Sequence, residues 1–542
     1  MTTPLIGWQS TDPVPDGHRF NDYLHVQNGR LYLADLDLAA LYEEGGHGLG
    51  PLSSPLELVY LPIIKDKIAQ LQAVFDKAIS ATGYAGAFHY AYASKANAAE
   101  EVIRTTLAAG AHHEMSSNID VNIAKLMIAQ GLLQPDKMII ANGFKGAGSP
   151  YAANLLRLKQ KHNNLIPVLE DLSEISPFLG AGVPFEVGLR YKSYSPNTEE
   201  IAEGTADSRF GFSRQDLWKA ADYISAAPNL SLKMLHVMVG GQITDVEAFI
   251  GRLRPGMVLY AQLKRRFPTL SIFNFGGGVP VQLTLDFAFD YNEFATKLLQ
   301  AMQAVCAEYQ VAVPDIMGEM GRYTTAEHGA HLFQIVTAKE NNSPTPWYIL
   351  NGSVMSSFPD VWALGELFIV LPLNHLDQPF QQVQLGGITC DSDDIYPPKK
   401  NPATLYLPVE TEGLHIGFFG IGAYQEMLGG ARGSKHCVLP EADELVVQGY
   451  DAESGRFQFR IIAGQSTAEV LANLGYHVRG AGWVLCGTIA SEKRANLVGE
   501  SVRGGGEISE RQGSAAVFLF KKSCFSGGEK GGSGSSQWQQ QE

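Results

Sequence analysis

The fold is decided by a stretch that begins with AFHYAYA at residues 87–93, passes through Lys95 and continues with AEEVIRTTLAAG at residues 99–110. The first run, rich in aromatic and small apolar residues, has the length and composition of a buried strand. The second run places apolar residues at helical spacing and ends in a glycine, which commonly follows a helix. The stretch therefore predicts a strand, a short loop that carries Lys95, and a helix.

The same order of strand and helix continues to about Ala330. Amphipathic segments such as VNIAKLMIAQG at residues 121–131 separate most of the strand-like runs. Eight strand–helix repeats predict an α/β fold, the parallel (β/α)8 or TIM barrel, whose usual size is about 250 residues. An open α/β sheet is the alternative with the same alternation. After the first run, the other seven begin near Ala111, Lys137, Leu165, Phe185, Leu232, Leu270 and Asp315.

After Ala330 the sequence becomes typical of a mostly antiparallel β domain. Runs such as HLFQIVTA, WYILNG, LHIGFF and RFQFRIIA are separated by Pro, Gly, Asn or Asp. The first 55 residues carry YLHVQNG and RLYLADL, joined by an Asn-Gly turn signal, and we expect them to pair into the same β domain. The chain from Ser526 is rich in Gly, Ser and Gln, which predicts a disordered tail. The predicted division is an N-terminal β segment at 1–55, the barrel at 56–330, a C-terminal β domain at 331–525 and the tail at 526–542.

Composition excludes several classes of function. The 542 residues contain 41 Lys and Arg against 56 Asp and Glu, a net charge of −15, which disfavours nucleic acids and anionic membranes as partners but suits a small cationic substrate. Five scattered Cys, without a Cys-x-x-Cys, form neither a disulfide framework nor a standard zinc site, and they indicate a reducing compartment. Neither a secretory signal nor an apolar run of about 20 residues is visible. We therefore expect a cytoplasmic protein without a metal site.

Polar residues follow the predicted barrel strands, at the end where TIM barrels carry their active sites. A lysine between an apolar strand and a helix start, such as Lys95, can be desolvated and form a Schiff base, although most lysines are solvated surface residues. Consecutive glycines after the seventh strand can aim N–H groups at a phosphate, although they are more often a flexible turn. After strand eight, Glu319 could keep a ring nitrogen protonated and Arg322 could bind phosphate, the alternative being a surface ion pair. The strand ends carry Lys95, Glu114, Asn142, Glu170, Arg190, His236, Gly276, Gly277, Gly278, Glu319 and Arg322.

These three signals together resemble the fold-type III pyridoxal-phosphate decarboxylases, which share their barrel with alanine racemase. The β domain adds SFPDVWA at 357–363, LNHLD at 373–377, TCDSD at 389–393 and GAYQEMLG at 422–429, in the order found in biosynthetic arginine decarboxylases. Upstream, NGFK at 142–145, RFGFS at 209–213 and the segment from Leu235 to Ile243 keep the same order. The resemblance extends from about Trp8 to Ala468.

The resemblance implies that the chain binds pyridoxal 5′-phosphate. Lys95 would hold the cofactor as a Schiff base, and Glu319 would pair with the pyridine nitrogen so that the ring accepts electrons as CO₂ leaves. The phosphate would be bound by Gly276, Gly277, Gly278, Gly321, Arg322 and Tyr424. The rest of the cofactor site would be formed by Glu114, Arg190 and His236.

The resemblance also implies the substrate side of the site. Cys390 would return the proton to Cα, the alternative being a buried structural thiol, and its pKa is readily tuned. Asp391, with Asp393 beside it, would meet the cationic end of the substrate. In the family these residues reach across a dimer interface into the neighbouring subunit's site, so a homodimer or higher homo-oligomer is expected. The implied reaction is decarboxylation of a basic L-amino acid, first of all arginine to agmatine, for polyamine and spermidine biosynthesis.

The sequence departs from the family pattern at three places. Met238 stands where a His stacks on the cofactor ring, and Gly241 where a Ser is usual. Val279-Pro280-Val281 replaces an Asp-Tyr-Asp, and the chain lacks room for a helical insertion and a long C-terminal extension. Ornithine, lysine, diaminopimelate or a conjugated amino acid therefore stay open as substrates, as does a catalytically weak regulatory homologue. A racemase is disfavoured, since racemases of this fold place an Arg where Glu319 stands.

Overall fold

The computed structural model describes residues 4–193, 208–340, 345–430, 433 and 435–476. They all lie in the first of the two units into which the chain divides, Met1–Trp483. The tail predicted from Ser526 lies outside the described residues, as do residues 477–525 of the predicted C-terminal β domain.

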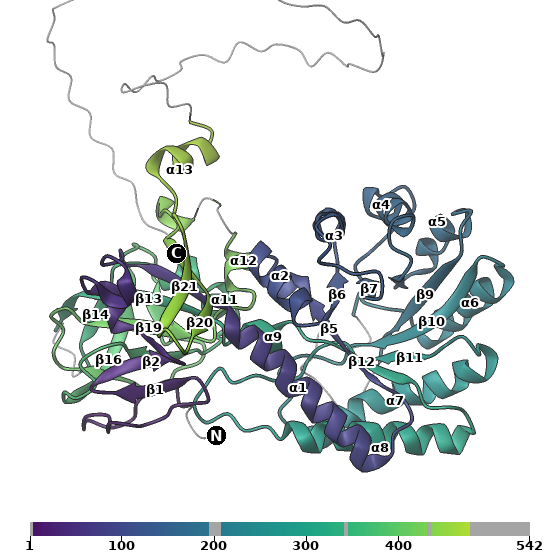
Figure 1. The fold of residues 1–542 in the computed structure, drawn as a ribbon, viewed down its shortest axis with the longest axis horizontal. Coiled ribbons are helices and arrows are strands. Elements are labelled where there is room, and N and C mark those ends of the chain that lie inside the picture. The colour runs from purple at the N-terminus through teal and green to yellow at the C-terminus, as the bar shows by residue number, and fades with distance from the viewer. Residues whose placement is uncertain (1–3, 194–207, 341–344, 431–432, 434, 477–542) are drawn as a thin grey trace, which may run out of the picture. The chain divides into compact units, whose positions relative to one another are not determined.

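Eight parallel strands of the described chain close into a barrel, in which each strand pairs with its neighbours in sequence and β12 pairs with β5 (Figure 1). This confirms the predicted TIM barrel and excludes the open sheet. Each of the eight predicted runs overlaps one strand. The strands are β5 Phe88–Ala93, β6 His112–Met115, β7 Ile139–Ala141, β8 Leu165–Leu169, β9 Phe185–Tyr191, β10 Leu230–Val237, β11 Ile272–Asn274 and β12 Asp315–Glu319.

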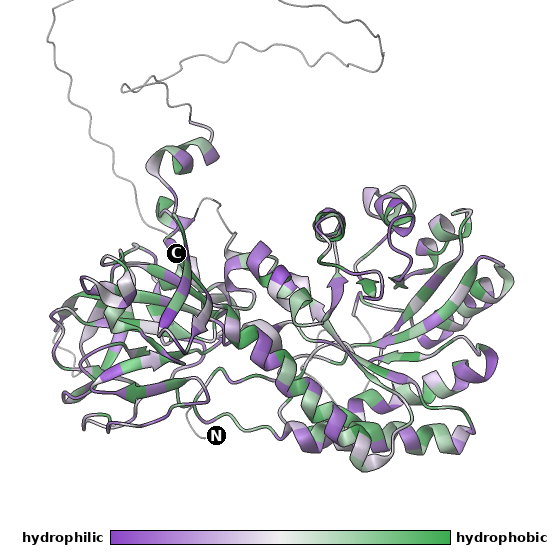
Figure 2. Cartoon of the chain, in the orientation of Figure 1, coloured by the Kyte–Doolittle hydropathy of each residue, from purple (hydrophilic) through white to green (hydrophobic). Residues whose placement is uncertain are grey.

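Helices surround the barrel, and polar caps fix where several of them begin. The side chains of Ser117, Asp245 and Asp290 accept hydrogen bonds from N–H groups of the first helical turn, which that turn cannot satisfy internally. Hydrophobic and hydrophilic residues intermingle along α1 and α8, whose apolar side chains are buried against their neighbours (Figure 2). The helices are α1 Leu61–Thr82, α2 Glu100–Ala108, α3 Asn118–Ala129, α4 Pro150–Lys159, α5 Ser176–Leu179, α6 Arg214–Ala226, α7 Val246–Arg266, α8 Tyr291–Tyr309 and α9 Arg322–Thr325.

The barrel interior is filled by a small apolar cluster of its own. Because side chains alternate across a strand, one set faces the helices and the other faces the barrel axis. The inner set consists of apolar side chains that fill the barrel below the polar strand ends. The strand ends therefore form the base of a closed site and do not open into a channel. The cluster consists of Ala91, Met138, Ile140, Ile166, Val168, Met234, Ile272 and Met317.

The β domain is a ten-stranded sheet whose strand pairs are mostly antiparallel, as predicted. β4 Leu56–Tyr60 lies between β13 and β20 of this sheet, although the predicted division assigned residues 56–60 to the barrel. Short helices α10 Val354–Ser357, α11 Pro359–Leu364, α12 Gln425–Gly429 and α13 Thr467–Asn473 accompany the sheet. Its other strands are β13 Gly329–Lys339, β14 Trp347–Leu350, β15 Ile369–Pro372, β16 Phe380–Gly386, β17 Ile395–Tyr396, β18 Leu405–Pro408, β19 His415–Phe419, β20 Asp443–Asp451 and β21 Arg456–Ile462.

The N-terminal strands form a small sheet of their own. β1 Leu24–Gln27, β2 Arg30–Leu33 and β3 Leu36–Asp37 pair only with one another by strand ladders within the described residues, around the predicted Asn28-Gly29 turn. Their apolar side chains share one buried cluster with strands of the large sheet. The N-terminal strands therefore pack against the large sheet and do not pair into it. Among the helices of the described residues, none is long and apolar enough to cross a membrane.

Candidate active site

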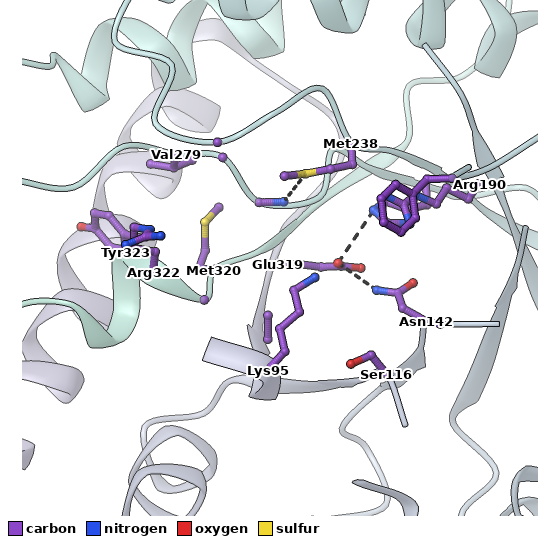
Figure 3. Close-up of a pocket in the computed structure, with 18 of the residues that line it drawn as sticks. Lys95, Ser116, Asn142, Arg190, Met238, Val279, Glu319, Met320, Arg322 and Tyr323 are labelled. Carbon is purple, nitrogen blue, oxygen red and sulfur yellow. Dashed lines mark hydrogen bonds and ion pairs between the residues drawn. The ribbon is translucent and has the colours of Figure 1, made fainter. Parts of the chain in front are cut away.

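A cavity of about 520 Å³ opens at the carboxyl ends of the barrel strands (Figure 3). Most of its lining comes from the loops that follow the strands, as the barrel fold predicts. Tyr424 comes instead from the β domain, immediately before α12, so both parts of the chain build the wall. Of the sequence-predicted residues, those that line the cavity are Lys95, Asn142, Glu170, Arg190, His236, Gly277, Gly278, Glu319, Gly321, Arg322 and Tyr424.

Lys95 follows β5 in a single 3₁₀ turn, Ser94–Ala96, and points towards Glu319 in the cavity (Figure 3). Its side chain is accessible from the cavity, whereas Ser94 and Ala96 on either side are buried. The carboxyl group of Glu114 raises the pKa of Lys95 more than desolvation lowers it, and Tyr424 and Glu319 add to the increase. Lys95 is thus held as an ammonium ion by its surroundings.

Glu319 ends β12 and is held by two asparagine side chains. Asn274 Nδ2 donates to Oε1 at 2.7 Å, and Asn142 Nδ2 donates to Oε2 at 2.9 Å. Burial opposes the ionisation of Glu319, but His236, Lys95 and the two amides outweigh it and lower its pKa. The cavity floor therefore carries a fixed carboxylate.

Glu114 lies behind the cavity wall and does not belong to the lining formed by the described residues. Asn142 Nδ2 donates to its Oε1 at 2.8 Å, so one amide group bridges Glu114 and Glu319. Burial raises the pKa of Glu114 to about 7, against the opposing effect of Lys95. Burial thus prevails at Glu114 and raises its pKa, whereas at Glu319 the neighbouring His236 and Lys95 and the two amide donors prevail over burial and lower the pKa.

The glycine turn after β11 has no space for side chains. A Cβ on Gly276 would lie 2.7 Å from Met238 Sδ, and one on Gly277 would lie 2.8 Å from the carbonyl oxygen of Glu319. Gly278 has a φ of +92°, which side chains rarely adopt. The turn therefore presents bare backbone to the cavity at Gly277 and Gly278, as a phosphate-binding loop requires.

Arg322 and Tyr424 line the cavity together with this turn. The guanidinium of Arg322 stacks 4.8 Å from the Tyr424 ring centre, and its Nη2 lies 3.4 Å from Asp360 Oδ2. Its Nη1 is buried and has no hydrogen-bond partner among the described residues. Tyr424 has a φ of +69°, a strained conformation of the kind that collects at binding sites. An unpaired guanidinium N–H beside bare backbone is a suitable place for an anion.

His236, Met238 and Arg190 also line the cavity. His236 is buried, and its ring nitrogens have no hydrogen-bond partner within the described chain. Burial lowers the pKa of His236 to about 4, so the imidazole is neutral at pH 7. Met238 Sδ accepts the N–H of Gly277 at 3.3 Å, and Arg190 Nη1 donates to Glu170 at 3.1 Å. The Met238 thioether thus contacts the glycine turn.

Cys390 and Asp391 lie on an exposed loop of the β domain, outside the cavity lining formed by the described residues of their own chain. The buried carboxylate of Asp394 holds this loop by accepting hydrogen bonds from Thr389 Oγ1 at 2.6 Å and Ser353 Oγ at 3.1 Å. Asp391 lies 3.5 Å from His436, and Asp393 lies 3.6 Å from Lys399. The structure therefore does not bring Cys390, Asp391 and Asp393 together with Lys95 within one chain.

Sequence reasoning missed Asn274 altogether. Its signal was a single amide in the apolar run LSIFNF, directly before the triple glycine. It also missed Gln242, whose side chain donates to Val281 O at 3.0 Å and accepts from Val281 N at 2.9 Å. Gln242 thus ties the loop after β10 to the chain that follows the glycines.

The residues present fit a phosphorylated pyridine. The glycine turn and the unpaired Nη1 of Arg322 suit the phosphate, the carboxylate of Glu319 suits a protonated ring nitrogen, and Lys95 supplies an amine. The fold and the site thus define a pyridoxal-phosphate enzyme built on a TIM-type barrel.

Comparison with known proteins agrees. Residues 66–326 match the family described as pyridoxal-dependent decarboxylase, pyridoxal binding domain, so this part of the chain is a pyridoxal-binding decarboxylase domain. It is 25% identical to a biosynthetic arginine decarboxylase of Deinococcus radiodurans, over 78% of this chain and 80% of that protein. It is 24% identical to arginine decarboxylase 1 of Oryza sativa, over 82% of this chain and 76% of that protein.

Solved structures share the fold. A biosynthetic arginine decarboxylase of Campylobacter jejuni superposes with a TM-score of 0.69 at 21% identity, over 84% of this chain and 89% of that one. A diaminopimelate decarboxylase of M. jannaschii superposes with a TM-score of 0.69 at 20% identity, over 84% of this chain and 98% of that one. These likenesses establish that barrel and β domain are combined as in fold-type III decarboxylases.

Buried histidines predict how stability depends on pH. Unfolded imidazoles take up protons below about pH 6.5, whereas the buried ones stay neutral until the pH reaches about 3 to 4. The unfolded state therefore binds more protons in this range, and stability should fall on acidification by up to about 1.4 kcal/mol per pH unit for each histidine. The carboxyl groups whose pKa is raised by burial act in the opposite direction but are fewer, namely those of Glu57, Glu114, Glu174 and Glu366. The histidines with a pKa lowered by burial to about 3 or 4 are His112, His113, His236, His328 and His331.

Calorimetry of the cofactor-free protein between pH 6.5 and 5 measures this effect, because most other carboxyl groups stay ionised there. We expect Tm to decrease steadily as the pH falls. A Tm that is constant or increases on acidification would contradict the assignment of neutral buried imidazoles.

Proposed function

We propose that this protein decarboxylates a basic L-amino acid, and that its substrate is L-arginine, which gives agmatine and CO₂ in polyamine biosynthesis. The observation that carries the reaction type is the pairing of Lys95 with the fixed carboxylate of Glu319 in one cavity. The curated relatives named arginine decarboxylase support the choice of substrate. Pyridoxal phosphate, when bound, supplies an electron sink for the charge that remains at Cα when CO₂ leaves.

The residues of the cavity would divide this work. Lys95 would attach the cofactor, and Glu319 would hold a proton at its ring nitrogen through a charge-assisted hydrogen bond. Gly277, Gly278 and Arg322 would bind the phosphate. Glu114, behind Lys95, would stabilise the Lys95 ammonium until the cofactor is attached.

Substrate recognition and reprotonation would depend on a second subunit. Cys390 would donate a proton to Cα, and Asp391 would bind the guanidinium of the substrate. Because both lie on an exposed loop outside their own cavity, we propose a homodimer in which this loop completes the neighbouring site. Asp393, which faces Lys399, would contribute less than Asp391. The free Cys390 and Cys437 fit the cytoplasmic location that we propose.

A substrate panel tests the proposed function. Purified protein loaded with pyridoxal phosphate should release CO₂ and agmatine from L-arginine faster than it releases amines from ornithine, lysine or diaminopimelate. A preference for diaminopimelate, on which structural relatives act, would overturn the arginine assignment but keep the reaction type. Cofactor binding without CO₂ release from any member of the panel would favour the regulatory homologue.

Mixed dimers test the shared site. Lys95→Ala and Cys390→Ala should each be inactive alone, since every site then lacks one of the two residues. When the two variants are mixed and reassociated, half of the dimers pair one of each, and one of the two sites in such a dimer is complete. Activity should therefore return to about one quarter of the wild-type value. Mixtures that stay inactive, although subunit exchange is demonstrated, would remove Cys390 from the neighbouring site.

A further inference from the structure

We infer that Asn274 and Asn142 are positioning residues, which keep Glu319 ionised and fix it relative to the glycine turn. This inference rests on the proposed role of Glu319 at the cofactor ring. Neither asparagine need touch the substrate, and neither needs to titrate. They act through the carboxylate that they hold.

Asn274 uses both halves of its amide. Its Nδ2 donates to Glu319 Oε1 at 2.7 Å, while its Oδ1 accepts the N–H of Gly276 at 2.9 Å. The side chain is buried at the end of β11, so water does not substitute for either partner. One amide therefore fixes the distance between the acid proposed for the ring nitrogen and the turn proposed for the phosphate, which are opposite ends of one rigid cofactor.

Asn142 uses a single NH₂ group on two acids. Its Nδ2 donates to Glu319 Oε2 at 2.9 Å (Figure 3) and to Glu114 Oε1 at 2.8 Å. Glu319 receives a second amide donor from Asn274, whereas Glu114 Oε2 is buried without a partner in the described structure. This unequal sharing favours the negative charge on Glu319 over a negative charge on Glu114.

An amide is required at position 274 because it must both donate a hydrogen bond to Glu319 and accept one from Gly276, and an ionised acid can only accept. An aspartate could still accept the Gly276 N–H, but it would face Glu319 with a second carboxylate and no donor. The ionisable or charged groups that surround Glu319 are Lys95, Glu114, Arg190 and His236, and His236 Nε2 lies 3.8 Å from Oε2. A second buried acid among them would raise the pKa of Glu319 and leave it neutral.

A reciprocal exchange tests the contact without cofactor. Asn274→Asp and Glu319→Gln should each lower the Tm of the cofactor-free protein by about 2–4 °C. The first variant leaves two carboxyl groups facing one another, and the second leaves the new amide NH₂ group facing the NH₂ group of an asparagine. In Asn274→Asp/Glu319→Gln the new glutamine can donate to the carboxylate introduced at position 274 and accept from Asn142, so much of the lost Tm should return. As the control, Asn292→Asp adds an acid at an exposed position of α8, and its effect should be additive with that of Glu319→Gln. Additive Tm losses in the Asn274 cycle would overturn the inference.

Cofactor spectra test whether the contact between Asn274 and Glu319 sets the charge of Glu319. Asn274→Asp should weaken pyridoxal-phosphate affinity about tenfold or more and shift the pH midpoint of the cofactor's absorption bands, whereas Asn292→Asp should change neither. Coupling in Tm with an unchanged pH midpoint would overturn the claim that these asparagines set the charge on Glu319. A wild-type protein without any cofactor absorption would overturn the proposed function instead, and the Tm cycle would still decide whether Asn274 holds Glu319.

Discussion

Replacement of Lys95 by alanine should abolish decarboxylation, with a loss in kcat on the order of 10⁴-fold or more, as expected when a covalent catalytic group is removed. Lys95 is the lysine that lines the cavity in the described structure, and its ammonium lies in the field of Glu114 and Glu319. Without it the cofactor has only non-covalent contacts. The measurement is the visible absorption of the purified protein after dialysis, together with CO₂ release.

The control for this variant is Lys77→Ala, which removes an exposed lysine of α1. It should retain both the absorption band and the activity. If Lys95→Ala kept a dialysis-resistant band, the assignment of Lys95 as the attachment point would be wrong. Because a lysine truncated at an open cavity leaves the barrel core intact, we expect little change in Tm, which separates lost chemistry from lost folding.

Glu319→Gln should be the second most damaging change in the cavity, with a decrease in kcat of about 10²–10³-fold. The substitution keeps the shape of the side chain but removes the charge that would hold a proton on the ring nitrogen. It also places an NH₂ group against Asn142 or Asn274, both of which donate to this site. The amino-acid substrate should still bind, so kcat should decrease far more than KM increases.

Two measurements distinguish the decrease in kcat of Glu319→Gln from a general disturbance of the fold. The cofactor absorption of Glu319→Gln should depend on pH differently from that of the wild type, since the proton on the ring nitrogen is no longer stabilised. Glu293→Gln, an exposed acid at the start of α8, should behave as the wild type. Unchanged kcat in Glu319→Gln would remove the electron-sink role from this residue.

The barrel could be predicted because its signals are local. Each strand is a short apolar run that is followed by an amphipathic helix, and eight repeats in one order leave few folds. The strand ends then located Lys95, Glu319 and Arg322, because every parallel strand of a barrel delivers its last residue to the same face. The place of residues 56–60 was not predictable in this way. β4 pairs with β13 and β20, which lie hundreds of residues further along the chain.

The sequence predicted part of the cavity lining but not the hydrogen bonds within it. Glu114 follows a barrel strand as Glu319 does, yet it lies behind the wall and keeps a proton near neutral pH. Asn274 carried no motif of its own, and its partner Glu319 is 45 positions away. Cys390 was identified by its neighbours in sequence, but only the fold places it on an exposed loop outside its own cavity.

The sequence by itself determined the class of this protein, since periodicity, strand ends and ordered motifs are properties of neighbouring residues. The tertiary structure decided which acid is charged, what holds it, and which residues of one chain meet. Those properties depend on burial and on distances of a few ångströms between residues far apart in sequence, because electrostatic and hydrogen-bond energies change steeply over such distances. Lys95 and Asn142 were found from the sequence, whereas Asn274 and the hydrogen bonds of both asparagines to Glu319 were found only from the fold.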